Sequence, residues 1–313
     1  MSSTVLIDKF QDPKVTIKGE TRAWVKYTKT KTLWFNTGTL CNIECVNCYI
    51  ESSPTNDRLV YLTCADVEPY LDELDAAGET DIEIGFTGGE PFMAPEMLAI
   101  LDMVLARGHS VLMLTNAMQP MMRPRVKGGL MELQDRYGDR LTMRVSLDHF
   151  SPQHHDEERG EGAFERAMQG LRWLSENGFR LALAGRTIWG EEEELARRGY
   201  LDLIVSENLR IDPDDPSQLV LFPEMRPDED PPEITTACWG ILNKDPNELM
   251  CASQRMVVKR KGAERPSVVA CTLLPYDDRF DLGHTLKEAR QSVSLNHSYC
   301  ASFCVLGGGS CSA

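Results

Sequence analysis

Residues 32–48 read TLWFN-TGTL-CNIECVNC, a short run rich in apolar residues followed at once by three cysteines. The run Thr32–Asn36 has the length and composition of a buried strand. Cys41, Cys45 and Cys48 lie in the loop that follows it. Barrels built from βα units place their chemistry in the loops after the strands. This stretch therefore predicts a thiol-bearing site at the C-terminal mouth of a βα barrel.

The pattern on either side of this stretch alternates between strands and amphipathic helices. Further strands are expected at Ile82–Phe86, Ser110–Leu114, Leu141–Leu147, Arg180–Ala184 and Leu201–Val205. Helices are expected at Ala65–Ala77, Ala94–Ala106 and Ala163–Asn177, each followed by a glycine. Such alternation is typical of a parallel sheet. We expect an α/β fold, a partial (βα)6 TIM-like barrel with a small cysteine-rich C-terminal domain.

Changes of composition suggest four segments: an N-terminal extension (1–30), the barrel (31–210), a linker or lid (211–236) and a C-terminal domain (237–313). The stretch 211–233 holds six prolines and eight acidic residues, which predicts extended structure. In the last segment we expect only short strands, such as Met256–Lys259 and Ser267–Ala270. A core that small would be stabilised by a bound metal.

Charge and hydropathy exclude several classes of protein. The 313 residues include 33 Lys and Arg against 48 Asp and Glu, a formal net charge of -15. Attachment to nucleic acid or to an anionic membrane surface is therefore not expected. No apolar run is long enough to span a bilayer, and the first ten residues lack the pattern of a signal peptide. A cytoplasmic location is expected.

The ten cysteines indicate metal binding rather than disulfides, because the cytosol keeps thiols reduced. Three soft thiolates suit an iron–sulfur cluster or zinc. Structural zinc normally takes four protein ligands, so Cys41, Cys45 and Cys48 alone favour a four-iron cluster with one iron left open. A structural zinc site completed by a distant ligand such as Cys64 is the alternative.

The CxxxCxxC spacing resembles that of the radical S-adenosylmethionine (radical SAM) superfamily. Further matches follow in the order of the family's motifs: Gly88-Gly89-Glu90-Pro91 for GGEP, Ser146 and Asp148 at a strand end, 155–164 (HDEERGEGAF) for HDxxRGxGSF, and Ile188-Trp-Gly190 with Glu193 for IxGxxE. One position departs from the family pattern. Asn47 stands where many members carry an aromatic residue that touches the adenine, and Tyr49 follows the third cysteine.

The resemblance implies a role for each of these groups. Cys41, Cys45 and Cys48 would bind a site-differentiated [4Fe–4S] cluster, whose open iron chelates the amino and carboxylate groups of S-adenosylmethionine. The GGEP segment would hold the methionine amino group, Ser146 and Asp148 the ribose, Arg159 the methionine carboxylate, and Ile188 the adenine. Reductive cleavage of S-adenosylmethionine would then yield a 5′-deoxyadenosyl radical that abstracts hydrogen from a substrate.

The C-terminal cysteines resemble the SPASM and twitch extensions of the same superfamily, which bind auxiliary [4Fe–4S] clusters. Cys251 and Cys271 bracket a predicted hairpin, but the final pair has CxxxC spacing where the family usually has CxxC. The preferred ligand set is Cys251, Cys271, Cys300 and Cys304, with Cys311 as the substitute. Cys238 lies outside that set. A zinc site is the alternative.

Two classes of function follow. The first is a radical SAM enzyme that modifies a small metabolite or a short peptide by oxidation or bond formation, rather than a leader-bearing precursor, and a ribosomal-peptide maturase is the alternative to that substrate class. The second is a non-enzymatic iron–sulfur or zinc-binding electron-transfer protein, which would need neither the GGEP segment nor the polar strand ends. Six basic residues in an otherwise acidic chain, Lys14, Lys18, Arg22, Lys26, Lys29 and Lys31, suggest a docking segment for a flavodoxin or ferredoxin. A structural role for that segment is the alternative.

Overall fold

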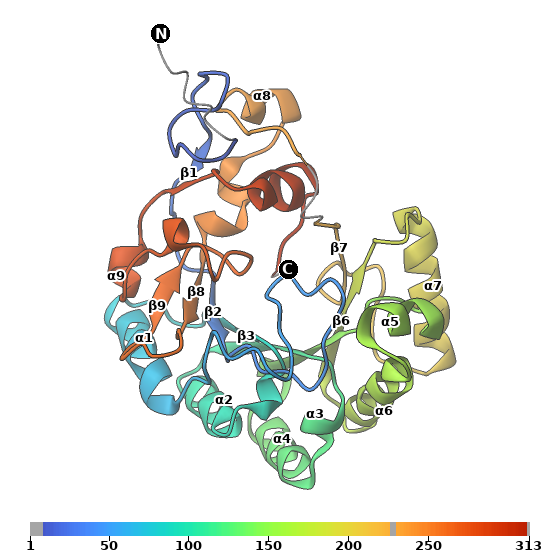
Figure 1. Cartoon of the computed structure of the whole chain (residues 1–313). Coiled ribbons are helices and arrows are strands. Elements are labelled where there is room, and N and C mark those ends of the chain that lie inside the picture. Colours follow the sequence, from blue (N-terminus) through green and yellow to red (C-terminus); the bar gives the residue numbers. More distant parts are fainter. Residues whose placement is uncertain (1–8, 226–229, 312–313) are drawn as a thin grey trace.

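The computed structural model describes residues 9–225 and 230–311, and an eight-stranded sheet forms its centre (Figure 1). The strand order is β7-β6-β5-β4-β3-β2-β8-β9. Their bounds are β2 (Thr32–Asn36), β3 (Glu83–Thr87), β4 (Ser110–Thr115), β5 (Leu141–Ser146), β6 (Arg180–Arg186), β7 (Leu219–Phe222), β8 (Gln254–Val258) and β9 (Ser267–Val269). All neighbours pair in parallel except β9, which is antiparallel to β8.

Helices cover the outer face of the curved sheet (Figure 1). They are α1 (Cys64–Ala76), α2 (Met97–Ala106), α3 (Gln119–Met122), α4 (Pro124–Tyr137), α5 (Pro152–Arg159), α6 (Ala163–Glu176), α7 (Glu193–Ser206) and α9 (Leu286–Ala289). The short helix α8 (Cys238–Leu242) lies apart from that face, beside the N-terminal segment (Figure 1). Single turns occur at Pro91–Met93, Gly138–Arg140, Pro246–Glu248, Met250–Ala252 and Asp278–Phe280, and a π-helix at Cys300–Leu306. No helix in the described ranges is long and apolar enough to cross a bilayer.

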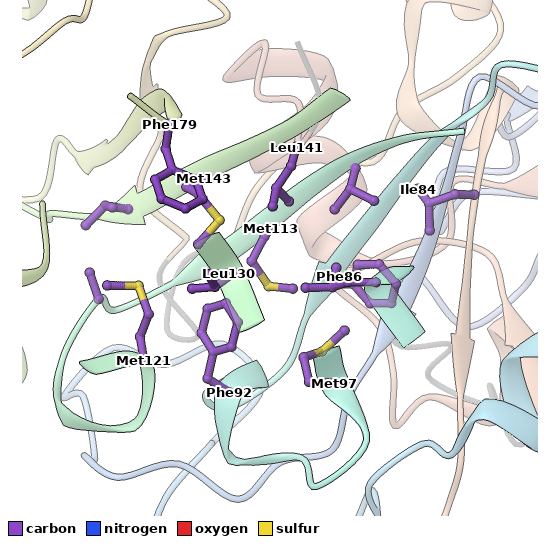
Figure 2. Packing of buried hydrophobic residues seen from close by; sticks show 14 of the residues in the cluster. Ile84, Phe86, Phe92, Met97, Met113, Met121, Leu130, Leu141, Met143 and Phe179 are labelled. Carbon is purple, nitrogen blue, oxygen red and sulfur yellow. The ribbon is translucent and has the colours of Figure 1, made fainter. Parts of the chain in front are cut away.

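The main core lies between the sheet and these helices (Figure 2). Phe86, Met113 and Met143 come from three successive strands, and Met97 and Leu130 pack against them from α2 and α4. Each of these side chains is at most 2% exposed. The parallel strands are thus sealed on their outer face, and their C-terminal ends remain available for a site.

A capping box begins α1 and ties it to the C-terminal part of the chain. The Asp66 carboxylate accepts hydrogen bonds from the Thr63 backbone N–H (3.0 Å) and hydroxyl (2.8 Å), and the Thr63 hydroxyl accepts one from the Asp66 N–H. The Lys259 ammonium, just after β8, donates to the same carboxylate at 2.8 Å. Although burial opposes it, these bonds lower the pKa of Asp66.

The N-terminal segment packs on the C-terminal part of the chain rather than standing apart. Strand β1 (Trp24–Val25) pairs with β10 (Val293–Ser294) in a second, two-stranded sheet. Arg22 is 1% exposed and forms an ion pair with Glu233. Figure 1 shows this blue segment beside the orange and red elements. The expected N-terminal extension therefore shares a core with the C-terminal residues.

Two sequence expectations about the barrel are wrong. Leu201–Val205 is not a strand but the last part of α7, whose buried residues Ala196, Tyr200 and Ile204 recur every four positions as a helix requires. The sixth barrel strand is β7, which lies inside the stretch 211–236 that we expected to be a linker. The partial barrel of six parallel strands, β2 to β7, is confirmed. Its last strand, β7, lies beyond residue 210.

Candidate active site

The three N-terminal cysteines line one pocket at the C-terminal ends of the barrel strands. Their loop is held by backbone hydrogen bonds, from Cys41 N–H to Ser53 O (3.0 Å) and from Val46 N–H to Glu158 O (2.9 Å). Burial raises the pKa of the Cys41 thiol to about 12 and also raises that of Cys45. Both thiols therefore stay protonated at neutral pH unless a cation replaces the proton.

The glycine pair after β3 closely approaches the start of the cysteine loop. The Gly89 N–H donates to Gly38 O at 2.8 Å, and a Cβ at Gly88 would meet the same oxygen at 2.6 Å. A Cβ at Gly89 would collide with the carbonyl oxygen of Leu40. Gly88 also has φ +139°, which side chains rarely adopt. The missing side chains therefore let the turn pack directly against the start of the cysteine loop, and both glycines line the pocket.

Glu90 belongs to the segment that the resemblance assigns to the methionine amino group, and its carboxylate has protein partners. The side chain is 1% exposed and accepts hydrogen bonds from the Thr115 hydroxyl (2.9 and 3.0 Å) and from the backbone N–H groups of Asn116 (2.9 Å) and Phe92 (3.2 Å). Burial raises its pKa to about 7. Glu90 is therefore a brace between the turn and the end of β4, because its oxygens are already occupied by protein donors.

Asp148 and Arg159 are brought together in the pocket wall. Asp148 follows β5, Arg159 ends α5, and the guanidinium donates from Nε at 2.6 Å and from Nη2 at 2.8 Å to the two carboxylate oxygens. Burial opposes ionisation of Asp148, but the Arg159 charge lowers its pKa overall. The resemblance assigns Asp148 to the ribose and Arg159 to the methionine carboxylate, and in the structure the two side chains form an ion pair with each other.

The remaining predicted cosubstrate residues do not all line the pocket. Ser146 lines the pocket, as do Gly88, Gly89, Asp148 and Arg159, whereas Pro91 and Ile188 are not among its described lining residues. Pro91 instead begins the short turn after Glu90. The adenine contact expected at Ile188 therefore has no support from the pocket.

Two lining residues escaped the sequence analysis. Asn116, just after β4, donates from Nδ2 to Asn42 Oδ1 at 2.9 Å, and a longer contact of 3.9 Å joins it to the Cys41 sulfur. Arg186, at the end of β6, donates to Asn47 O at 3.2 Å and pairs with Glu158 and Glu224. Both lie at the C-terminal ends of predicted strands, and that position could have identified them as site residues.

The preferred C-terminal cysteines share a second cavity. Cys251, Cys271, Cys300 and Cys304 all line it, amid apolar side chains such as Leu274 and Phe280. Burial raises the pKa of Cys251 to about 11 and that of Cys271 to about 12, and it raises those of Cys300 and Cys304 as well. Four thiols in an apolar cavity match the donor set of an iron–sulfur cluster.

The other cysteines lie elsewhere. Cys311, the expected substitute ligand, lines the first pocket instead, where its sulfur is 3.0 Å from the Thr272 hydroxyl. Cys238 contacts Thr235, and Cys64 begins α1. In the described residues, no three His, Cys, Asp or Glu side chains converge tightly enough to hold a single metal ion. A cubane does not require such convergence, because each thiolate binds a different iron.

Comparison with known sequences adds two kinds of relative. The chain is 32% identical over 145 residues to the antilisterial bacteriocin subtilosin biosynthesis protein AlbA of Bacillus subtilis, which is 46% of this chain and 30% of AlbA. It is 30% identical over 140 residues to the mycofactocin maturase MftC of Mycolicibacterium smegmatis, 44% of this chain and 33% of MftC. The match thus spans about a third of each curated relative.

Solved structures share the fold at low sequence identity. The enzyme anSMEcpe with bound AdoMet superposes with a TM-score of 0.59 at 14% identity, over 82% of this chain and 76% of that one. Streptococcus suis SuiB superposes with a TM-score of 0.57 at 11% identity, over 90% of this chain and 67% of SuiB. The profile of the radical SAM superfamily matches residues 35–196, slightly more than half of the chain. The chain therefore belongs to the radical SAM superfamily.

Proposed function

We propose that this chain is a radical SAM enzyme that reductively cleaves S-adenosylmethionine in the pocket of Cys41, Cys45 and Cys48 and modifies a peptide. The observation that carries the proposal is convergence: the three thiols, the Gly88-Gly89 turn and the Asp148–Arg159 pair line a single pocket. An electron-transfer protein without a cosubstrate would need only the thiols.

The protein's own residues would bind and orient that ligand. When bound, the reduced cluster supplies the electron that splits the sulfonium carbon–sulfur bond and so generates the 5′-deoxyadenosyl radical. The exposed backbone at Gly88 and Gly89 would accept the methionine amino group. Ser146 and Asp148 would hold the ribose hydroxyls, and Arg159 would both fix Asp148 and attract the methionine carboxylate. Asn116 would steady the loop beside Cys41.

The second cavity would hold an auxiliary [4Fe–4S] cluster on Cys251, Cys271, Cys300 and Cys304. The shared lining supports this set over one that includes Cys311. The second cavity adjoins the active-site pocket in sequence. Thr272, which follows Cys271, lines that pocket and contacts Cys311. Such a cluster would accept an electron from the substrate radical or anchor the substrate.

A peptide is the substrate class that the comparisons favour over a free metabolite. AlbA is named for the biosynthesis of a bacteriocin and MftC for the maturation of mycofactocin. SuiB has been crystallised with the precursor peptide SuiA, and anSMEcpe with the peptide Cp18Cys. These substrates belong to those proteins. The sequences of AlbA and MftC are much longer than the part that matches this chain. A ribosomally made peptide is our proposal for this chain.

The function is tested by anaerobic assay of the reconstituted protein with S-adenosylmethionine and dithionite. The expected products are 5′-deoxyadenosine and methionine. The Cys41→Ala, Cys45→Ala, Cys48→Ala triple variant should form neither. Full cleavage by the triple variant would refute the assignment, and no cleavage by the iron-loaded wild type would refute the enzyme class.

A flavodoxin or ferredoxin is the proposed electron donor. Lys14, Lys18 and Lys26 are exposed on the N-terminal segment, and such a basic strip would attract an acidic donor. Replacing these three lysines by Gln should slow cleavage with flavodoxin at low salt and leave the rate with dithionite unchanged. Equal rates with flavodoxin for wild type and variant would refute donor docking and leave the segment with a structural role alone.

A further inference from the structure

The residues that line the active-site pocket are of two kinds. The thiols, the glycines and the charged side chains come from the barrel strand ends and their loops, together with apolar residues such as Trp34, Ile43 and Leu114. A group of five apolar residues comes from the end of β7, from the stretch after it and from the C-terminal part of the chain: Phe222, Pro223, Met225, Leu273 and Phe303. The rings of Phe222 and Phe303 lie 5.9 Å apart, so the two contributing segments pack as one surface. We name these five residues the apolar wall.

The charged side chains that line the pocket are already paired. Arg159 is held by Asp148, and Arg186 donates to Glu158 at 3.2 Å and to Glu224 at 3.1 Å. These five residues carry two positive and three negative charges, so both guanidinium groups are bound by carboxylates and one negative charge is in excess. An anionic substrate side chain entering here would lose its hydration without gaining an opposite charge, and that is costly.

The polar groups beside the apolar wall are also occupied. The Thr272 hydroxyl and the Cys311 thiol contact each other at 3.0 Å, and both residues are at most 5% exposed. Arg144 donates to the Cys311 carbonyl at 2.7 Å and so fixes the position of that thiol. Leu273, next to Thr272, is thereby held in place with its side chain on the pocket. What the wall offers to a ligand is apolar contact.

We infer that the apolar wall is the subsite for an uncharged, apolar side chain of the peptide, in the same pocket as the proposed cleavage site. This inference rests on the proposed function, because it assigns the substrate side chain that this same pocket selects. Apolar burial rewards leucine or phenylalanine there, whereas aspartate would be rejected by desolvation beside an excess of carboxylates. Selectivity would therefore come from the C-terminal part of the chain and the radical chemistry from the barrel.

The test uses the tripeptides acetyl-Gly-X-Gly-amide, with X as Leu, Phe, Ser, Asp or Lys, and iron-loaded enzyme with S-adenosylmethionine but no reductant. Saturation-transfer NMR gives the affinity of each peptide. We expect Leu and Phe to bind about tenfold or more tightly than Asp, in line with the selectivity of hydrophobic pockets. Equal affinities for all five, or no transfer to the Leu and Phe peptides, would overturn the inference.

Variants locate the effect on the wall. Met225→Asp should abolish the preference for Leu and favour Lys, and Met225→Leu should retain the wild-type order. Ile241→Asp is the matched control, because Ile241 is 77% exposed on α8 and outside the pocket lining. A folded Met225→Asp protein, checked by circular dichroism, that keeps the wild-type order would contradict the assignment of the wall. Misfolding would leave the wild-type ranking as the deciding measurement.

The peptide ranking and the cleavage assay fail independently. Wild-type enzyme that cleaves S-adenosylmethionine but binds all five peptides alike would refute the apolar subsite and leave the proposed function standing. Wild-type enzyme that ranks the peptides as expected but forms no 5′-deoxyadenosine would refute the proposed function instead.

Discussion

The Arg159 guanidinium and the Asp148 carboxylate face each other in two hydrogen bonds of 2.6 and 2.8 Å, and Asp148 is 3% exposed. A bidentate pair of this kind fixes both side chains in one plane. It joins the residues after β5 to the end of α5, so the pair holds a strand end and a helix end of the pocket together.

Replacing Arg159 by Lys keeps the charge and removes the fork. Affinity for S-adenosylmethionine should fall about tenfold or more, since one point charge cannot hold both oxygens of Asp148. Arg197→Lys is the matched control, because Arg197 pairs with Glu193 on the exposed side of α7. Equilibrium binding to the iron-loaded protein checks this, and equal affinities for the two variants would contradict it.

Removing the Asp148 charge should cost stability as well as binding. Asp148→Asn leaves the Arg159 charge buried with a neutral partner, and breaking a buried pair typically costs about 3 kcal/mol. Denaturant unfolding of the metal-free protein measures this free energy of unfolding. A change below about 1 kcal/mol, the range of exposed pairs, would mean that water replaces the lost charge.

The two sets of cysteines should lose iron separately. The alanine triple variant at Cys41, Cys45 and Cys48 should lose about four iron atoms, the content of one cubane, and keep the rest. Cys64→Ala should keep all of its iron, because Cys64 lines neither cavity among the described residues. Iron and sulfide analysis with electron paramagnetic resonance distinguishes these outcomes. Iron loss in the Cys64 variant would favour the zinc-type site with Cys64 as fourth ligand.

Cys311 separates the two possible auxiliary ligand sets. Cys300→Ser should remove the auxiliary cluster, whereas Cys311→Ser should retain it, because the Cys311 sulfur lies on the active-site pocket. Both variants replace sulfur by oxygen at positions that are at most 9% exposed. Iron content per chain is the measurement. Loss of about four iron atoms from Cys311→Ser would place it in the ligand set.

The Asp66 contacts predict a stability effect with a defined pH dependence. Because the folded-state pKa of Asp66 is lowered below 3.8, its contribution is present above that pH and is lost as the pH falls through the folded pKa. Asp66→Asn should lower the free energy of unfolding by about 1 kcal/mol at pH 7, as for other lost caps. The difference from wild type should shrink toward pH 3.

The exposed Asp72 provides the control for that effect. Its side chain is 63% exposed and pairs with Arg107, so Asp72→Asn should change stability by well under 1 kcal/mol. Denaturant unfolding of both variants from pH 7 to pH 3 makes the comparison. A pH-independent loss in Asp66→Asn would mean that the capping geometry, and not the charge, carries the effect.

The barrel was largely predictable because its strands carry dense apolar runs. Thr32–Asn36 matches β2 residue for residue, and Ser110–Leu114 falls within β4. Leu201–Val205 failed because the same apolar density occurs at the end of α7, where Leu201 and Val205 are 41% and 69% exposed. A buried strand would not expose both. In short apolar runs, the helical repeat of the preceding residues is the better guide.

β7 was hidden by its surroundings rather than by its own sequence. Leu219–Phe222 is apolar, but it stands among prolines and acidic residues that indicate a linker. Its pairing with β6 is a tertiary contact that local sequence does not encode.

The sequence motifs predicted the positions of the site's backbone segments. They predicted less well which partners the side chains contact. Gly88 and Gly89 line the pocket as expected. The carboxylate of Glu90 accepts hydrogen bonds from three protein donors. They are the Thr115 hydroxyl on β4, the Asn116 N–H just after it and the Phe92 N–H in the turn. Asn116 and Arg186 belong to no quoted motif and become visible only when the strand ends are assembled.

The pairing of β1 with β10 has a consequence for how the protein is made. Trp24 and Ser294 are register partners, so nearly the whole described chain lies between two strands that must meet. The ribosome delivers Trp24 long before Ser294, and the N-terminal strand must wait without its partner until the distant segment emerges. The small core that includes Val25 and Phe303 thus closes last, since contacts between remote segments form slowly. Insertion of a cluster beside that core would then be a late, post-translational step.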